Sequence, residues 1–229
     1  MGCSPAEGAC GHTASAATGT IGLVNDKIDL KKTLDSYQAR SGEFRILDVP
    51  PLQYLMIDGH GDPNTTPEYT AAVEALYPLA YTLKFASKQL GRDFTVMSLE
   101  GLWWADDAAA FTTARDKSAW HWTLMIMQPD WISAELFEAA VAKVAAKKDA
   151  PRSLASVRLE SLDEGRCVQT LHLGAFDDEG PTLARLHDEF IPAHGLRMSG
   201  RHHEIYLSDL RRTEPSRLRT ILRQPVEVC

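Results

Sequence analysis

The sequence lacks paired cysteines. Its four cysteines are Cys3, Cys10, Cys167 and Cys229, and no two of them form a Cys-x-x-Cys motif. This spacing gives no basis for a disulfide framework or for a zinc site built on paired cysteines. The cysteine content therefore fits a reducing compartment, and we expect the protein in the cytoplasm.

Long apolar runs are also absent. No segment approaches the roughly 20 consecutive apolar residues that cross a bilayer, and the first residues lack the charged and apolar regions of a secretory signal. We therefore predict no membrane partner. Residues 1–26 are rich in Gly, Ala, Ser and Thr, which indicates a flexible leader that does not join the core.

Positive charge is scarce relative to negative charge. The chain has 24 Lys and Arg residues against 31 Asp and Glu residues, a formal net charge of −7. This balance argues against a nucleic-acid partner, which would favour a basic surface. One basic cluster is interpreted as the solvated face of a final turn and helix, and it comprises Arg211, Arg212, Arg217, Arg219 and Arg223.

The length and composition of residues 27–229 are typical of one globular domain. Pro67 after Thr66 predicts the start of a long helix, and Ser133 caps a second helix of about residues 133–148. A hairpin is expected around the turn at residues 163–166, and Thr213 to Ser216 should start a last short helix. Strands are predicted at residues 44–49, 52–57, 94–104, 120–128, 157–162, 167–173 and 201–209, with further helices at 29–38 and 182–194.

The order of these predicted elements repeats. Each half runs through two strands, an acidic loop with glycine, a helix that starts at proline, and a strand. We therefore predict two pseudo-repeats, at about residues 44–130 and 156–210, joined by the helix at 133–148. The repeat makes Glu100 a counterpart of Glu204, and two such halves side by side predict a cleft between them.

The predicted strand His202–Asp209 carries the most informative pattern. Because side chains alternate along a strand, His202, Glu204 and Tyr206 share one face. A carboxylate among aromatic groups would be partly desolvated, which raises its pKa and makes it a stronger base near neutral pH. The alternative is a glutamate on an edge strand that faces water, and the pattern alone does not decide between them.

All five tryptophans fall between residues 103 and 131. On neighbouring antiparallel strands, the face of Glu100 and Trp104 and the face of Trp120 and Trp122 could wall one flat aromatic pocket. Such walls bind planar or cationic ligands. A tryptophan-rich core is the alternative interpretation.

Metal and cofactor motifs are missing from the sequence. His202 and His203 are adjacent on a strand and point apart, so they would not bind one metal ion together. Gly59-His60-Gly61 lacks the spacing of a dinucleotide fingerprint, and no Gly-x-Ser-x-Gly elbow is present. We therefore expect no metal and no cofactor.

Four motifs resemble those of GyrI-like small-molecule-binding proteins. They are YLMIDGHGDP from Tyr54, LEGLWW from Leu99, WTLMIMQPD from Trp122 and HEIYLSDLRR from His203. The resemblance extends from about Phe44 to Val228. It implies an α+β fold, a pseudo-two-fold pair of strand-helix-strand modules with an antiparallel sheet and a central ligand cleft.

The resemblance also implies roles for residues. Glu204 matches the pocket glutamate of the family and Tyr206 its neighbouring aromatic residue, so both are candidate catalytic residues. Related domains are effector-binding parts of multidrug-sensing regulators, and stand-alone members include hydrolases of cyclopropanoid toxins. The candidate ligand-binding residues are Tyr54, Glu100, Trp103, Trp104, Trp120, Trp122, Met125 and His202.

Two functions remain open at this stage. The chain could be a binding protein that sequesters planar, apolar or cationic compounds, or a hydrolase in which Glu204 activates water. Both have a small molecule as partner, and the chain is expected to be a monomer or a homodimer. A module for protein interaction would need a large exposed apolar patch, which the sequence does not show clearly.

Overall fold

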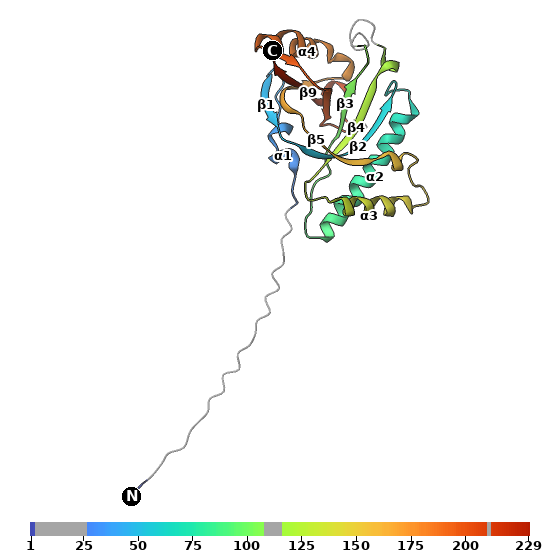
Figure 1. Ribbon diagram of the computed structural model, residues 1–229, viewed down its shortest axis with the longest axis vertical. Coiled ribbons are helices and arrows are strands. Elements are labelled where there is room, and N and C mark those ends of the chain that lie inside the picture. The colour runs from blue at the N-terminus through green and yellow to red at the C-terminus, as the bar shows by residue number, and fades with distance from the viewer. Residues whose placement is uncertain (3–26, 108–115, 210–211) are drawn as a thin grey trace.

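An antiparallel sheet of nine strands organises the computed structural model, which describes residues 1–2, 27–107, 116–209 and 212–229 (Figure 1). Helices pack on this sheet, so the α+β class and the antiparallel sheet predicted from sequence are confirmed. The predicted leader falls outside the described residues except for Met1 and Gly2. The division into pseudo-repeats at 44–130 and 156–210 stays a prediction.

The strands follow the order β1-β6-β9-β8-β3-β4-β2-β5 across the sheet, and β7 pairs with β9 outside this path. The bounds are β1 (Arg45–Val49), β2 (Leu52–His60), β3 (Leu99–Trp104), β4 (His121–Gln128), β5 (Arg158–Leu162), β6 (Gly165–Leu173), β7 (Leu196–Met198), β8 (His202–Tyr206) and β9 (Arg219–Val228). β3 and β8 are neighbours near the middle of the sheet, and each belongs to a different half of the chain.

One long helix packs on the sheet, a second long helix packs on the first, and several short helices complete the fold. The α-helices are α1 (Leu30–Thr33), α2 (Pro67–Gln89), α3 (Ala134–Ala145), α4 (Gly180–Ala184) and α5 (Ile191–Ala193), and α4 continues into the π-helical segment η6 (Arg185–Phe190). Short 3-10 turns are η1 (Asp35–Tyr37), η3 (Lys117–Ala119), η4 (Leu154–Ser156), η5 (Phe176–Asp178) and η7 (Pro215–Arg217).

The sequence explains where α2 begins, what it buries and where it ends. Pro67 occupies the first turn, where its missing N–H costs nothing. Leu76, Leu79 and Leu83 recur at helical spacing and are fully buried. Gly91 follows the helix at a φ of +86°, a conformation that favours glycine. The predicted stripe is confirmed at these leucines, but Phe85 is 56% exposed.

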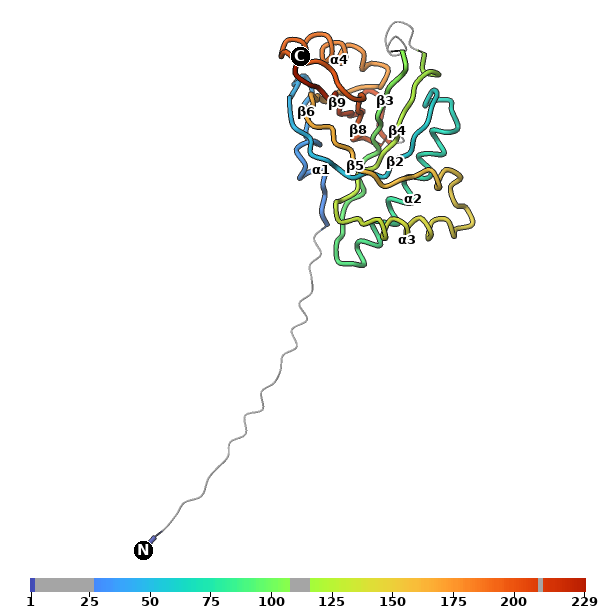
Figure 2. The backbone as a smooth tube through the Cα atoms, viewed as in Figure 1, coloured from blue at the N-terminus to red at the C-terminus, as the bar shows by residue number. Residues whose placement is uncertain are grey.

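Short connections join opposite ends of the sheet. β1 pairs with β6 at one end, yet only Pro50 and Pro51 separate it from β2, which pairs with β4 and β5 at the other end. Asp163 and Glu164 likewise join β5 to β6 across the sheet. The sheet must therefore curl so that its ends approach each other, and the trace in Figure 2 shows this curvature.

Two predicted features are wrong. The strands expected as a hairpin at residues 163–166 are not partners, because β5 pairs with β2 while β6 pairs with β1 and β9. The predicted final helix is the strand β9, with only the short turn η7 before it. Leu218, Ile221 and Leu222 form too short an apolar run to distinguish helix from strand.

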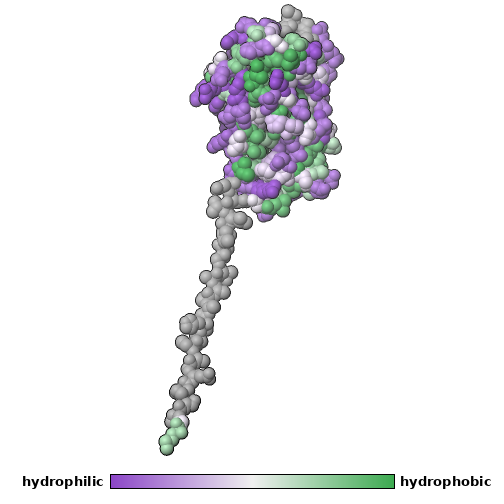
Figure 3. All heavy atoms as spheres, turned by 60° about the vertical axis from the view of Figure 1, so that its left-hand side comes forward, coloured by the Kyte–Doolittle hydropathy of each residue, from purple (hydrophilic) through white to green (hydrophobic). Residues whose placement is uncertain are grey.

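The surface mixes charged and apolar side chains. On the face seen in Figure 3, apolar side chains gather in a band that hydrophilic residues border and interrupt. The exposed large hydrophobic residues include Ile28, Ile46, Leu173, Met198 and Val228. Among the described helices, none is both long enough and apolar enough to span a bilayer.

Candidate functional site

Strand β8 separates two groups of polar side chains. His202, Glu204 and Tyr206 point to the side of the sheet on which α2 packs, which we call the helix face. His203 and Ile205 point to the opposite side, which we call the network face. Because Gly101 pairs with Glu204 and Glu100 pairs with Ile205, the same alternation sorts the side chains of β3.

On the helix face, a chain of hydrogen bonds ends at Glu204. The indole Nε1 of Trp103 donates to the hydroxyl oxygen of Tyr206 at 3.0 Å, and the Tyr206 hydroxyl donates to Oε2 of Glu204 at 2.8 Å. The Glu204 side chain is 15% exposed. This arrangement fixes the orientation of the carboxylate and leaves its second oxygen, Oε1, without a donor from Trp103 or Tyr206.

Aromatic rings surround this carboxylate. Tyr69, from the first turns of α2, stacks on Trp103 with ring centroids 6.4 Å apart and meets Trp122 edge-on at 5.4 Å. Trp120 contacts Trp103 edge-on at 5.7 Å. We call these four residues the aromatic cluster. On the other side, Phe176 packs edge-on against Tyr206 at 5.4 Å.

Two glycines make room for this arrangement. A Cβ atom on Gly59 would lie 1.9 Å from the Trp122 ring, and a Cβ atom on Gly101 would lie 2.8 Å from Nε1 of Trp103. Both approaches are closer than side chains tolerate without a shift. Glycine at these positions therefore allows the tryptophans to lie flat against the sheet.

Burial makes Glu204 an unusual acid. Removal from water disfavours the ionised carboxylate and raises the pKa of Glu204 from 4.5 to about 7, although the Tyr206 hydrogen bond and the charge of His203 act in the opposite direction. The carboxyl group is therefore close to half ionised at neutral pH. It can take up or release a proton there, as a general base must.

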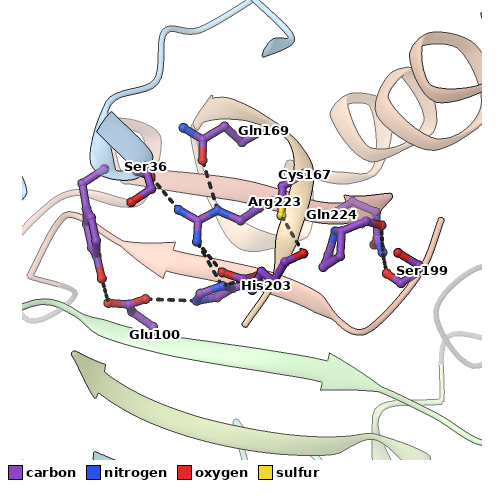
Figure 4. A network of polar contacts seen from close by, with 11 residues as sticks. Ser36, Glu100, Cys167, Gln169, Ser199, His203, Arg223 and Gln224 are labelled. Atoms are coloured by element: carbon purple, nitrogen blue, oxygen red, sulfur yellow. Dashed lines mark hydrogen bonds and ion pairs between the residues drawn. The ribbon is translucent and has the colours of Figure 1, made fainter. Parts of the chain in front are cut away.

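The network face holds a second, fully buried polar group. His203 Nε2 lies 3.0 Å from Oε2 of Glu100, and its Nδ1 lies 2.9 Å from Oε1 of Glu164. Arg223 Nη1 donates to Oε2 of Glu164 at 2.6 Å. Tyr37 donates its hydroxyl hydrogen to Oε1 of Glu100 at 2.6 Å. Figure 4 shows Glu100, His203 and Arg223 close together, and they come from the separate strands β3, β8 and β9. We call these three residues, together with Glu164 and Tyr37, the buried network.

Charge neutralisation explains the protonation states in the buried network. Burial alone would raise the pKa of Glu164, but the charges of His203 and Arg223 hold it at about 2. Burial would lower the pKa of His203, but Glu164 and the hydrogen bond to Glu100 raise it instead. Glu164 and Arg223 are therefore charged together inside the protein, and their surroundings favour the protonated form of His203.

The structure separates the predicted site residues. Trp103, Trp120, Trp122, His202, Glu204 and Tyr206 lie on the helix face. Glu100 is fully buried on the network face, so the expectation that it lies across a cleft from Glu204 is wrong. By the strand registers, Tyr54, Trp104 and Met125 also lie on the network face, so Trp104 and Trp120 do not wall one pocket.

Sequence patterns missed several residues that complete these two groups. Tyr69 belongs to the aromatic cluster, but it precedes the apolar stripe by which α2 was recognised. Arg223 was interpreted as solvated, yet its side chain is fully buried because it lies on a strand and points to the network face. Glu164 is in the turn between β5 and β6, and no sequence pattern there indicates that its side chain is buried.

Two surface cavities lie away from Glu204. One of about 380 Å³ is bordered by Leu102, Glu164 and Arg201, and one of about 410 Å³ by Gln38, Arg40 and Gln169. Glu204 borders neither cavity, so the chemistry of the side chains around Glu204 identifies the candidate site. In the part of the chain that the structure describes, no cluster of three or more His, Cys, Asp or Glu side chains could hold a metal ion.

Solved structures with substantial sequence identity share this fold. An uncharacterised conserved protein from Listeria innocua is 38% identical, with a TM-score of 0.80, and the match covers 88% of this chain and all of that one. A hydrolase from the same organism is 37% identical over the same shares, with a TM-score of 0.75. The C-terminal domain of EcmrR, at 9% identity and a TM-score of 0.51, shares the fold over 82% of this chain and 98% of that domain.

A family model agrees with these structures. No curated protein matches the sequence, but the model of the GyrI-like small molecule binding domain matches residues 42–227. The match includes both strands of the Glu204 region, the aromatic cluster and every member of the buried network except Tyr37. This chain belongs to the family of GyrI-like small molecule binding domains.

Proposed function

We propose that this protein binds a planar, largely apolar small molecule against the aromatic cluster and hydrolyses it with water that Glu204 activates. The substrate class is a cyclopropanoid electrophile, and the role is protection of the cytoplasm against such a toxin. One observation carries the proposal: a carboxyl group with a pKa of about 7 lies among aromatic rings at the end of a hydrogen-bond chain.

Tyr69 and Trp120, the partly exposed members of the aromatic cluster, supply the binding surface, and the buried Trp103 and Trp122 pack against them. Indole and phenol rings offer large apolar faces, and stacking on a planar ligand adds to the hydrophobic gain. Trp103 and Tyr206 are tied together by a hydrogen bond, so these side chains would lose little freedom when a ligand binds. The Glu204 carboxylate then places a negative charge beside these rings.

Glu204 supplies the base. In the proposed step, a water oxygen forms a bond to the less substituted cyclopropane carbon while Glu204 takes a proton from that water. The cyclopropane carbon–carbon bond breaks, and its electron pair moves into the conjugated ring, whose carbonyl oxygen becomes a phenolate and then takes up a proton. Tyr206 holds the carboxylate by donating to Oε2, which leaves Oε1 for the water.

The comparison with the Listeria proteins supports an enzyme. A relative that is 37% identical over 88% of this chain is described as a hydrolase. The same geometry also suits a second candidate, a non-catalytic protein that sequesters cationic aromatic compounds, because an ionised Glu204 beside tryptophan faces attracts a cation. A time course separates the two candidates, since only the enzyme consumes its ligand.

The test is Glu204→Gln with a cyclopropane-fused cyclohexadienone as probe. Glutamine keeps the size of the side chain and can still accept the Tyr206 hydrogen bond, but it cannot take a proton from water. We expect binding, followed by tryptophan fluorescence, to change by less than about threefold, and turnover to fall at least about 100-fold. Glu138→Gln, on the exposed face of α3, is the matched control.

Turnover that survives Glu204→Gln would reject Glu204 as the base. Wild-type protein that quenches on titration and leaves the probe unchanged over hours would favour sequestration instead.

A further inference from the structure

A pair of histidines lies beside Glu204 on the helix face. His202 is two residues before Glu204 on β8, and its side chain is 15% exposed. His187, from the π-helical segment η6, meets it edge-on with ring centroids 5.8 Å apart and an interplanar angle of 87°. The pair thus joins η6 to the strand that carries the carboxylate.

Three of the four ring nitrogens of this pair make no hydrogen bond of ordinary length to the protein. Nδ1 and Nε2 of His202 and Nε2 of His187 are inaccessible to solvent and have no hydrogen-bond partner among the described residues. Gln224, a neighbour on β9, uses its amide hydrogens on the carbonyl oxygens of Ser199 and Pro225. Buried polar atoms are normally hydrogen-bonded, so these nitrogens indicate a site for a small polar group.

The distance to Glu204 suits one bridging oxygen. Nε2 of His202 lies 3.7 Å from Oε1 of Glu204, which is too long for a direct hydrogen bond. Oε1 is the carboxylate oxygen that Tyr206 does not contact. A single water molecule can hydrogen-bond to two groups at this separation.

The histidines have the protonation state that such a water needs. Burial, with the neighbouring His187 and His203, lowers the pKa of His202 to about 3 against the opposing effects of the Gln224 side chain and the Glu164 charge. Burial also lowers the pKa of His187. Both rings are therefore neutral at pH 7. A neutral imidazole has one nitrogen that accepts a hydrogen bond, whereas an imidazolium has none.

We propose that His202, with His187 behind it, holds the water molecule that Glu204 deprotonates. The inference rests on the proposed function and assigns His202 to the water instead of the ligand. The water donates one hydrogen to Oε1 of Glu204 and the other to a ring nitrogen of His202. Its lone pair then points away from both groups toward the aromatic cluster, where it forms the new carbon–oxygen bond while Glu204 takes the proton.

The first measurement is a crystal structure of the unliganded wild-type protein at a resolution that shows ordered water. We expect a solvent oxygen within about 3.2 Å of both Nε2 of His202 and Oε1 of Glu204. This measurement needs no turnover, so it decides the inference even if the proposed hydrolysis fails. Absence of such an oxygen, with both side chains well ordered, overturns the inference.

The second measurement compares His202→Phe, His187→Phe and His202→Gln with the same cyclohexadienone probe. Phenylalanine removes the acceptor and keeps the ring, so we expect kcat to fall about 10- to 100-fold while the binding constant changes less than about threefold. Glutamine at position 202 restores an acceptor and should recover part of the loss. His60→Phe is the control, because His60 pairs with His121 on the network face.

The outcomes separate the two proposals. Unchanged kcat in both phenylalanine variants, or weaker binding with unchanged kcat, overturns the assignment of the pair to water. Wild-type protein that never consumes the probe rejects hydrolysis, and the crystal structure then still decides whether the pair holds water.

Discussion

Glu204 retains a proton near neutral pH that an exposed glutamate would have lost. Since its folded pKa of about 7 exceeds the ordinary value of 4.5, the folded state binds the proton more tightly than the unfolded state. Stability from this group is therefore fully present below about pH 4.5 and is lost as the pH rises to about 7. A shift of this size corresponds to about 3 kcal/mol as an upper bound.

Glu204→Gln removes this pH dependence. We expect the variant to gain stability relative to wild type as the pH rises from 5 to 8, by about 1–3 kcal/mol, because the wild type alone must bury an ionised carboxylate. Urea unfolding followed by circular dichroism at each pH measures the difference. Parallel curves for the two proteins would contradict the raised pKa, and Glu138→Gln should give such parallel curves.

At the scale of single residues, the sequence predicted part of the site. The shared face of Glu204 and Tyr206 follows from the period of two along a single strand, which needs no tertiary information. The face of Glu100 relative to Glu204 depends on the register between β3 and β8, which one sequence does not specify. The pairing of His202 with His187 required the position of η6 in space.

Strand β3 illustrates how an element shapes the site without contributing chemistry at every position. Gly101 lies opposite Glu204, and a Cβ atom there would lie 2.8 Å from Nε1 of Trp103 and 3.2 Å from the Tyr206 hydroxyl. The missing side chain thus lets the two residues form their hydrogen bond. Strand β3 therefore shapes the site both through the missing side chain at Gly101 and through the Trp103 ring.

Gly101→Ala tests this role. The added methyl group should separate Trp103 from Tyr206, shift the tryptophan emission, weaken probe binding and lower stability by about 1–3 kcal/mol. Gly180→Ala at the start of α4 is the control, because no atom lies within 4 Å of its added Cβ. Equal behaviour of the two variants would show that the close packing at Gly101 is not needed.

Elements with long periodic patterns could be predicted, and short ones could not. α2 and α3 carry helix-starting residues followed by buried stripes, and both were predicted. The segment that forms β9 was predicted as a helix, because Leu218, just before the strand, and Ile221 and Leu222 within it fit either period over so short a run. The same error led to the prediction that Arg223 is exposed, since a helix would have placed it on one face with the exposed arginines.

At the scale of the whole molecule, the buried network links distant parts of the chain. Arg223 on β9 donates to the backbone oxygen of Ser36 in η1, to Gln169 on β6 and to Glu164 in the turn between β5 and β6. His203 extends these contacts to β8 and, through Glu100, to β3. Removing one charge would leave the others buried without compensation.

Arg223→Met should therefore destabilise the protein by about 3–5 kcal/mol. Adding Glu164→Gln to that variant should recover part of the loss, because it removes the carboxylate that Arg223 neutralises. The free energy of unfolding in urea measures both effects, with the exposed Arg219→Met on the same strand as control. A loss below about 1 kcal/mol would contradict the importance of this buried ion pair.

The pairing of strands that are far apart in the sequence has a consequence for synthesis of the protein. β1 leaves the ribosome more than a hundred residues before its partner β6, and β2 waits similarly for β5. Translation proceeds at about 5–20 residues per second, so β1 remains an unpaired edge for several seconds. An unpaired strand can associate with other chains. A newly made molecule therefore passes through a period in which chaperones, and the speed of elongation, influence how much of it reaches the native state.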